Sequence, residues 1–220
     1  RTINSEGYVE ARAALSDGFG KMLEIHENSI YDIFHNVVGK LCIFRDVTVE
    51  RDLEKQILHS SNTDFLTGLY NRRYFYQYIH GSRGNKSVSL LYIDLDWFKA
   101  VNDTYGHKVG DAVLTGTART LVESFPNDFV ARLGGDEFLV ARLGECSVEQ
   151  LEKEAGEFLA KLNARFQASR EMSSLSASIG IAQGTDSHMD IDLLIQHSDQ
   201  ALYQAKKEGR SRYCVYREQE

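Results

Sequence analysis

The sequence has few cysteines, and they are far apart. Cys42, Cys146 and Cys214 are the only three in 220 residues, and no Cys-x-x-Cys pair occurs. A disulfide framework and a structural zinc site are therefore not expected. The seven histidines include no pair spaced as His-x-x-x-His, so they do not indicate a metal site either. We expect the cysteines to be idle or buried thiols.

Long apolar runs and an excess of positive charge are also absent. No run approaches the ~20 apolar residues that cross a bilayer, and no signal peptide is visible at the start. The formal net charge of −7 argues against a general nucleic-acid-binding surface. We therefore expect a cytoplasmic protein whose present segment contacts neither nucleic acid nor membrane. The first residue is Arg1, so a longer parent chain with an upstream membrane anchor stays open.

Residues 1–48 differ from the rest of the chain. The runs 21–33 and 41–47 are strand-like, and the turn signal Asp17-Gly18 precedes the first of them. They predict two or three strands of an antiparallel sheet. A helix is expected over 49–60, with Thr48 as its N-cap. Val49, Leu53 and Ile57 form one apolar stripe on this helix, which suits either subunit pairing or packing on one side.

The strand that closes on Asp46-Val47-Thr48, followed by a helix, resembles the end of a PAS sensor domain. Only part of the usual length of a PAS domain is present. The alternative is a small β extension that packs on the main domain. The sequence does not indicate which stimulus such a segment would sense.

The main domain begins near Asn62 and is expected to be α+β. Its strands and helices follow the order β-α-β-β-α-β, which is the split βαβ arrangement of ferredoxin-like and palm-like sheets flanked by helices. The expected elements are a helix over 71–82, a strand over 88–94, a short helix after Trp97, a helix over 108–125, a hairpin of 128–133 and 136–142, a helix over 148–166, a strand over 175–182, a helix over 191–207 and a strand over 212–216.

Two acidic segments indicate a metal-bound nucleotide site. Gly134 and Gly135 form a turn between two apolar runs, where glycine reaches positive φ without steric cost and a polyanion can approach the backbone. The carboxylates of Asp136 and Glu137 follow this turn at once. Asp94 ends a buried strand that the split βαβ order places beside it. Paired carboxylates with a backbone carbonyl suit Mg²⁺.

Other polar residues around these segments could contact a nucleotide. Trp97-Phe98-Lys99 leads into a short helix whose free N–H groups attract phosphate, and Lys99 supplies a point charge. Lys206 and Arg210 lie four residues apart near a helix end, a spacing that alone is more typical of solvent-exposed charges. The polar residues suited to the base edge of guanine are Asn102 and Asp111, with His107 nearby.

Three motifs in order, residues 64–72, 94–111 and 134–138, together with Gln204-Ala205-Lys206 and Gly209-Arg210, closely resemble the GGDEF family of diguanylate cyclases. The resemblance covers about residues 60–216. It implies condensation of two GTP molecules into cyclic di-GMP with release of two pyrophosphates, and a homodimer in which each subunit brings one nucleotide. It divides the chain into a partial PAS-like segment (1–48), a connecting signalling helix (49–61) and a GGDEF domain (62–220).

The resemblance also assigns site residues. It implies Mg²⁺, with Mn²⁺ as a substitute, held by Asp94, the carbonyl of Leu95, Asp136 and Glu137. It implies catalytic roles for Asp136, Glu137 and Lys99, with Asp136 as the candidate metal-linked base, although the sequence does not separate the roles of Asp136 and Glu137. The residues that it places on the substrate are Phe98, Asn102, His107, Asp111, Lys206 and Arg210.

One family feature is missing. Many members carry Arg-x-x-Asp shortly before the hairpin, where product binds and inhibits, but here Phe125 stands in place of the arginine while Asp128 is kept. Phenylalanine cannot pair with a phosphate, so we expect weak or no product inhibition through this site. Two alternatives stay open: a catalytically inactive module that binds GTP or cyclic di-GMP, and a different nucleotidyl cyclase or palm-type polymerase with the same pair of carboxylates.

Overall fold

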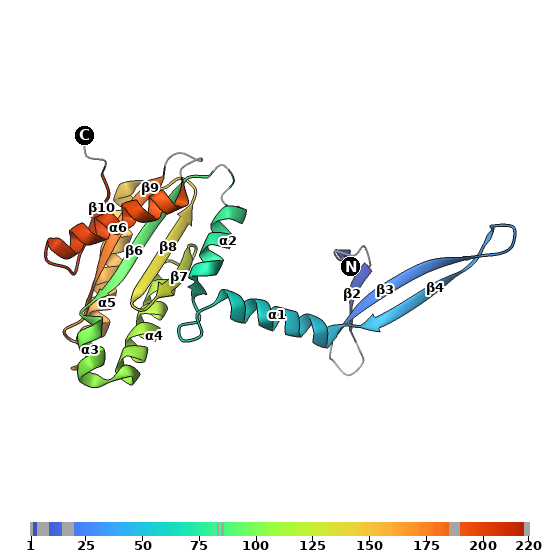
Figure 1. Ribbon diagram of the computed structural model, residues 1–220, viewed down its shortest axis with the longest axis horizontal. Coiled ribbons are helices and arrows are strands. Elements are labelled where there is room, and N and C mark those ends of the chain that lie inside the picture. Colours follow the sequence, from blue (N-terminus) through green and yellow to red (C-terminus); the bar gives the residue numbers. More distant parts are fainter. Residues whose placement is uncertain are drawn as a thin grey trace. The chain divides into compact units, whose positions relative to one another are not determined.

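The computed structural model describes residues 2–3, 9–14, 20–82, 84, 86–184 and 190–217, and the chain divides into two compact units, residues 1–61 and 62–220. The first unit contains an antiparallel sheet whose strands follow chain order: β1 (Thr2–Ile3), β2 (Val9–Ala14), β3 (Gly20–Tyr31) and β4 (Val37–Asp46) (Figure 1). The sheet has four strands rather than two or three, because β2 pairs with the first half of β3. The expected Asp17-Gly18 turn lies outside the described residues.

Helix α1 (Thr48–Asn62) follows β4. The expectation that Thr48 is its N-cap was wrong, because the helix begins at Thr48 itself. Asp46 accepts hydrogen bonds from the backbone N–H of Thr48 at 3.1 Å and from its hydroxyl at 2.7 Å. The Thr48 hydroxyl oxygen instead accepts from the N–H of Met22 at 2.9 Å, which ties the helix to β3. Among the described residues, no helix has the length and apolar character needed to cross a bilayer.

The second unit is built on a mixed six-stranded sheet in the order β10-β9-β6-β8-β7-β5. Strand β6 is central and antiparallel to both β8 and β9. The expected α+β split βαβ fold is therefore present. Its elements are β5 (Tyr70–Asn71), α2 (Arg72–Ser82), β6 (Val88–Asp96), α3 (Phe98–Tyr105), α4 (His107–Ser124), β7 (Phe129–Gly134), β8 (Glu137–Leu143), α5 (Val148–Gln167), β9 (Ser176–Gly184), α6 (Ile191–Lys207) and β10 (Tyr213–Val215).

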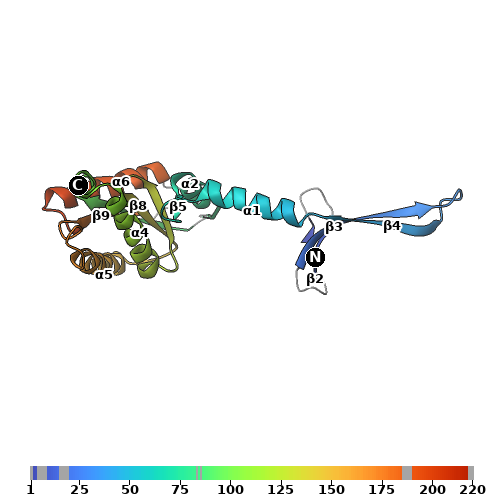
Figure 2. The same cartoon turned by 90° about the horizontal axis from the view of Figure 1, so that it is seen from below.

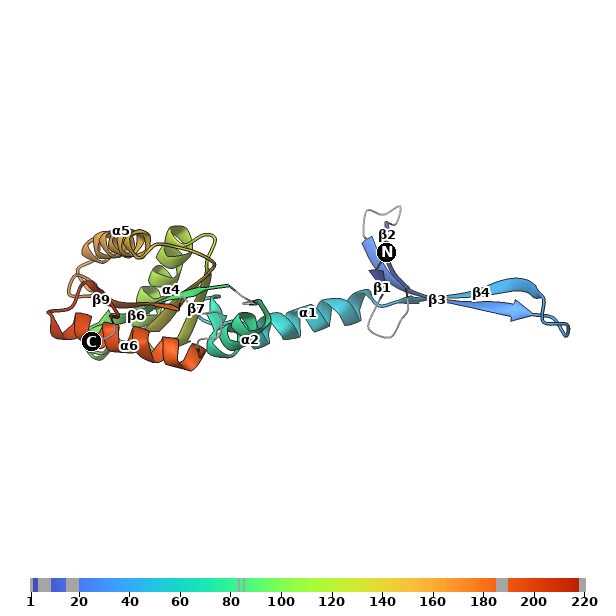
Figure 3. The ribbon, with the colours of Figure 1, turned by 90° about the horizontal axis from the view of Figure 1, so that it is seen from above.

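Helices cover both faces of this sheet. Figures 2 and 3 show α4 and α5 on one side and α2 and α6 on the other. Strand β6 serves both layers, since Leu91 and Ile93 join the core under α4 and α5, whereas Leu90 and Tyr92 join the core under α2 and α6. This double burial explains the near-continuous apolar run of the strand.

Strand β5 was not predicted. Tyr70 and Asn71 were expected at or before the start of a helix, and two residues are too few to display strand alternation. They pair in parallel with Ala131 and Arg132 of β7. Asn71 also accepts a hydrogen bond from the N–H of Tyr74 at 2.9 Å, so it caps α2 while closing the edge of the sheet.

Candidate active site

The two acidic segments meet at the ends of β6 and β8. Asp94 is paired with Glu137 across the antiparallel ladder, and the N–H of Leu95 donates to the carbonyl of Asp136 at 3.3 Å. Directly opposite residues on antiparallel strands project their side chains from the same face. Asp94 and Glu137 therefore project from one face, with Asp136 in the turn beside them.

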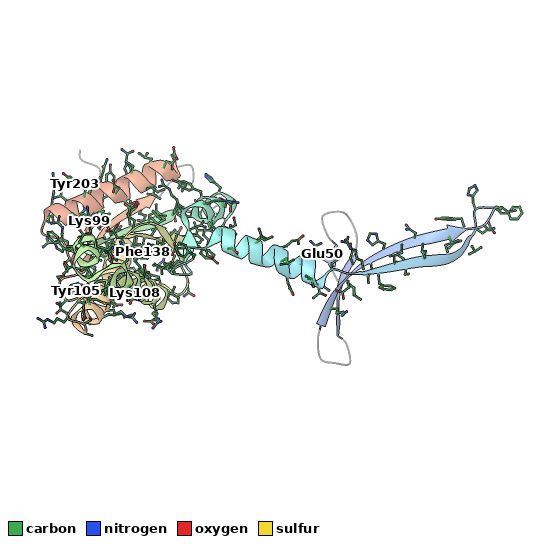
Figure 4. All side chains as sticks on the ribbon, turned by 60° about the horizontal axis from the view of Figure 1, so that its bottom comes forward. Glu50, Lys99, Tyr105, Lys108, Phe138 and Tyr203 are labelled. Atoms are coloured by element: carbon green, nitrogen blue, oxygen red, sulfur yellow. The ribbon has the colours of Figure 1, made fainter. Side chains whose placement is uncertain are left out.

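A cavity of about 220 Å³ opens at this end of the sheet. Seven of the residues predicted from the sequence line it, and two further residues of the same segment, Asp96 and Trp97, do so as well. The predicted lining residues are Asp94, Leu95, Phe98, Lys99, Asp136, Lys206 and Arg210. Figure 4 shows Lys99 at the rim of the domain and Phe138, which is fully buried, inside it. The fold thus gathers three lysine and arginine side chains and three aspartates around one space.

The electrostatics of the cavity favour a bound cation. The carboxylate of Asp94 is only 15% exposed and pairs with Lys206, whose Nζ lies 2.8 Å from Oδ1. Burial raises the pKa of Asp94, and the charges of Asp136 and Asp96 raise it further, although Lys206 acts in the opposite direction. Neutralising this cluster with a divalent ion would relieve the repulsion between the carboxylates.

The donor set fits magnesium. Asp94, Asp136 and Glu137 offer carboxylates, and Leu95 offers a backbone carbonyl. Across the described ranges no group of three or more His, Cys, Asp or Glu side chains is assembled as a ready metal cage. Mg²⁺ does not require one, because it commonly keeps several waters and takes further oxygens from substrate phosphates.

Glu137 lies beside the cavity rather than among the residues that line it. One of its partners is Tyr92: burial raises the pKa of the Tyr92 phenol, and the charge of Glu137 and a hydrogen bond with it raise that pKa further. A phenol with a raised pKa stays protonated and can donate to a carboxylate. Tyr92 therefore holds the Glu137 carboxylate by a hydrogen bond, which the sequence did not indicate.

Helix α3 presents its N-terminus to the cavity. Trp97 precedes it with φ 65° and provides no side-chain cap. The N–H groups of a first helical turn lack partners within the helix and favour anions. Phe98 is 8% exposed and anchors the turn in the core, so the group that it offers to a ligand is its backbone N–H.

The predicted base-contacting residues lie apart from this cavity. Asn102 is on α3, while His107 and Asp111 are exposed on α4. Within the part of the chain that the structure describes, Asn102 Oδ1 is buried without a hydrogen-bond partner. Gly110 makes this possible, since a Cβ there would lie 1.9 Å from that oxygen. An unpaired buried acceptor suits a ligand that donates N–H groups.

Two residues that the sequence did not single out organise the site. Asp96 is buried and accepts hydrogen bonds from the hydroxyls of Ser176 and Ser178. Arg132 donates from Nε and Nη2 to the carbonyl of Gly135 at 3.0 and 2.7 Å. The available sequence signals were the i, i+2 spacing of Asp94 and Asp96, and an arginine two residues before the glycine pair.

In the segment that stands in place of Arg-x-x-Asp, the charged group is already paired, although Phe125 and Asp128 line a cavity of about 240 Å³. Phe125 is 2% exposed and packs on Phe158. Asp128 accepts two hydrogen bonds from Arg142, from Nε at 2.9 Å and from Nη2 at 2.6 Å. Arg142 also pairs with Glu154 at 2.7 Å, so the carboxylate of Asp128 already has its cation.

Comparison with known proteins agrees with this architecture. Residues 61–212 match the model of the family described as "Diguanylate cyclase, GGDEF domain". The chain is 36% identical over 208 residues to the Escherichia coli diguanylate cyclase DgcM, covering 90% of this chain and 48% of that protein. It is 32% identical over 226 residues to a Vibrio cholerae diguanylate cyclase, covering 96% and 67% of the two chains.

Two further similarities bear on function. The Escherichia coli cyclic di-GMP phosphodiesterase PdeR is 36% identical over 185 residues, which covers 82% of this chain and 28% of PdeR. The crystal structure of the coiled coil and GGDEF domain of DgcB from Caulobacter crescentus, in complex with c-di-GMP, matches with a TM-score of 0.67 and 26% identity over 77% of this chain and 93% of that one.

The chain spans about a quarter of PdeR and about half of DgcM. The family model nevertheless matches well over half of this chain, and the paired acidic strands lie where its Gly-Gly-Asp-Glu-Phe hairpin requires them. The chain therefore belongs to the GGDEF-domain diguanylate cyclase family.

Proposed function

We propose that this chain is a diguanylate cyclase output module that condenses two GTP molecules into cyclic di-GMP and releases two pyrophosphates. The observation that carries the proposal is the single cavity in which Asp94 and Asp136 meet Lys99, Lys206 and Arg210. A triphosphate beside carboxylates needs both a metal and fixed cations, and this cavity offers a place for each.

Magnesium, or manganese in its place, would be held by Asp94, the Leu95 carbonyl, Asp136 and Glu137. The ion supplies charge neutralisation at the α-phosphate and lowers the pKa of the attacking 3′-hydroxyl. Asp136 is the candidate to accept the hydroxyl proton, and Glu137, supported by Tyr92, holds its carboxylate toward the same ion.

The remaining residues bind and orient the nucleotide. Lys206 and Arg210 hold the terminal phosphates, the N–H of Phe98 contacts a phosphate oxygen, and Lys99 faces the charge that develops in the transition state. The base lies between α3 and α4. There Asn102 and Asp111 accept the N–H donors of guanine, with His107 at the same nucleotide, and the buried, unpaired Oδ1 of Asn102 supports this assignment.

Each cavity takes one GTP, so the reaction requires two subunits face to face. The exposed apolar stripe of α1 supports a homodimer: Val49, Leu53 and Ile57 are 71%, 51% and 67% exposed. In this proposal residues 1–48 are a partial PAS-like sensor segment, 49–61 a signalling helix and 62–220 the cyclase domain, which acts in the cytoplasm on the GTP pool. The N-terminal segment regulates the activity.

Product inhibition through residues 125–128, which stand in place of Arg-x-x-Asp, is proposed to be weak or absent. Phe125 supplies no charge, and Arg142 occupies the carboxylate of Asp128. A phosphate diester of cyclic di-GMP would therefore meet a buried aromatic ring and an ion pair that is already formed.

A second candidate is a module that binds GTP or cyclic di-GMP without catalysis. The observation that favours it is the similarity to PdeR, whose name is that of a phosphodiesterase, because a match to this family does not by itself specify synthesis. The acidic residues at the cavity and beside it argue for catalysis, since a binding module has no need of Asp136 and Glu137 together.

The test is incubation of the purified chain with GTP and Mg²⁺, followed by mass spectrometry of the products. Cyclic di-GMP and pyrophosphate are expected with the native chain and neither with Asp136→Ala. Parallel reactions with ATP test for a different nucleotidyl cyclase. If the native chain binds GTP but forms no product with Mg²⁺ or Mn²⁺, at concentrations where it is dimeric, the second candidate is correct.

A further inference from the structure

We propose that Asp96 is a positioning residue that fixes Arg210 and the turn of residues 209–211 at the mouth of the cavity, and thereby sets the affinity for the triphosphate. The inference rests on the proposed function in one respect, because it takes Arg210 as a phosphate-binding group. It assigns Asp96 no contact with metal or nucleotide.

The carboxylate of Asp96 is enclosed by donors. Its side chain is fully buried. The hydroxyl of Ser176 donates to Oδ2 at 2.7 Å, and the hydroxyl of Ser178 lies 2.9 and 3.1 Å from the two oxygens. The N–H of Ser211 donates to Oδ2 at 3.2 Å, and Arg210 Nε lies 3.8 Å from Oδ1.

Asp96 differs in its surroundings from Asp94, which lies two residues earlier on the same face of β6. Asp94 has one cationic partner, Lys206, whose side chain is 31% exposed and can move to a phosphate. Asp96 is bound from β9 and from the turn after α6. Removing a buried carboxylate from its donors to ligate a metal would leave those donors unpaired, which is unfavourable.

The turn that Asp96 holds has an unfavourable backbone. Arg210 and Ser211 have φ of 64° and 52°, and Trp97 has φ of 65°. These are three of the four non-glycine residues with positive φ in the described ranges. Such conformations are unfavourable for residues with a side chain and persist only where neighbours hold them. The hydrogen bond from the N–H of Ser211 to Asp96 is one such restraint.

The restrained turn places the guanidinium of Arg210 over the indole of Trp97. The guanidinium carbon lies 4.7 Å from the ring centroid, within the range of a cation–π contact. Trp97 follows Asp96 directly in the chain. One buried residue therefore restrains both partners of the stack. It is bonded covalently to Trp97, and it holds Arg210 through the hydrogen bond from the neighbouring Ser211 and the 3.8 Å ion pair, while 41% of the Arg210 side chain stays exposed for a ligand.

Trp97 is the only tryptophan in the chain, so its fluorescence reports on the stack without any nucleotide. We would measure its quenching by acrylamide in the native chain, Asp96→Asn, Arg210→Ala and a control, Asp128→Asn, which removes a carboxylate charge from the separate ion pair with Arg142. Asp96→Asn and Arg210→Ala are expected to raise the quenching constant of Trp97 to a similar extent, about twofold, and Asp128→Asn to leave it unchanged.

The second readout is affinity for the β,γ-imido analogue of GTP with Mg²⁺, together with steady-state kinetics. Asp96→Asn is expected to weaken analogue binding and raise KM by about tenfold, with kcat changed by less than about twofold, because a positioning residue acts on ground-state binding. A direct metal ligand would instead lower kcat by orders of magnitude.

Ser178→Ala keeps the inference testable if Asp96→Asn does not fold, because it removes one donor to Asp96 and leaves the other donors in place. It should change the quenching constant and KM in the same direction but less. Unchanged quenching in folded Asp96→Asn or in Ser178→Ala, alongside a clear change in Arg210→Ala, would overturn the inference. A native chain that forms no cyclic di-GMP yet shows the expected quenching pattern would contradict the proposed function alone.

Discussion

Arg132 donates two hydrogen bonds to the carboxylate of Asp64, at 3.0 and 3.1 Å, although 68 residues separate them. The same guanidinium donates to the carbonyl of Gly135. The side chain of Arg132 therefore links Asp64, near the start of the domain, to the turn that carries Asp136. Both side chains are largely buried, at 11% and 17% exposure, so this pair is shielded from solvent.

Breaking this link should destabilise the domain. Arg132→Ala is expected to lower the free energy of unfolding by about 3 kcal/mol, because it leaves the carboxylate of Asp64 without its cation. Arg132→Lys should recover only part of the loss, since an ammonium cannot make the paired hydrogen bonds. Urea denaturation measures both, and a double-mutant cycle with Asp64→Ala should give a coupling energy above about 1 kcal/mol. A coupling near zero would contradict the assignment.

The same pair predicts a dependence of stability on pH. Burial alone would raise the pKa of Asp64, but hydrogen bonds from Thr67 and from Arg132 outweigh it and lower the pKa. Because the folded-state pKa is lowered, the carboxylate contributes stability at pH values above the unfolded-state pKa, near 3.9. That stability is lost as the pH falls through the folded-state pKa. Asp64→Asn should therefore be less stable than the native domain at pH 7 and approach it in stability near pH 3. Thermal unfolding across this range is the measurement.

Asp94 should behave in the opposite way. Its pKa is raised, chiefly by burial, so its ionised form disfavours folding and the native chain loses stability as the pH rises through the folded-state pKa. Without divalent metal, Asp94→Asn is expected to melt at a higher temperature than the native chain at pH 7, and the difference should vanish at pH below about 4. Added Mg²⁺ should raise the melting temperature of the native chain only. Asp103→Asn, at an exposed position on α3, is the control.

Gly110 offers a test of base recognition. A Cβ at Gly110 would lie 1.9 Å from Asn102 Oδ1, whereas a Cβ at Gly116 on the same helix would lie 3.7 Å from the side chain of Arg165. Gly110→Ala should displace Asn102 and weaken GTP binding by about tenfold, or ~1.4 kcal/mol, with loss of preference over ATP. Gly116→Ala should bind as the native chain does. Equal GTP affinity in all three proteins would remove Asn102 from the base site.

Placing an arginine at position 125 should not create product inhibition. Phe125 is buried against Phe158, and a charge placed there is expected to cost about 3 kcal/mol or more in unfolding free energy. Val122→Arg, at a half-exposed position near the end of α4, should cost much less. Calorimetric titration of Phe125→Arg with cyclic di-GMP at low temperature should detect no tight site, because Arg142 holds Asp128. Tight binding that is lost in Phe125→Arg/Asp128→Ala would reverse this conclusion.

The sequence by itself determined the parts of this protein that depend on short-range patterns. The central strand, the hairpin around Gly134 and Gly135 and the helices of the main domain lie within one or two residues of their predicted bounds. Strand and helix periodicity, glycine at positive φ and apolar runs are properties of neighbouring residues, so a chain read alone contains them. The acidic ends of β6 and β8 could be placed together because the split βαβ order fixes which strands are adjacent.

The tertiary structure alone decided which partner each polar group has. Lys206 meets Asp94, Arg132 meets Asp64, and Asp96 is enclosed by Ser178 and Ser211. These partners are 68 to 115 residues apart in the chain, from the pair of Arg132 and Asp64 to the pair of Asp96 and Ser211. A buried carboxylate is satisfied by whatever donors the folded backbone brings within about 3 Å. Packing across the sheet determines which donors these are, and no local feature of the sequence predicts them.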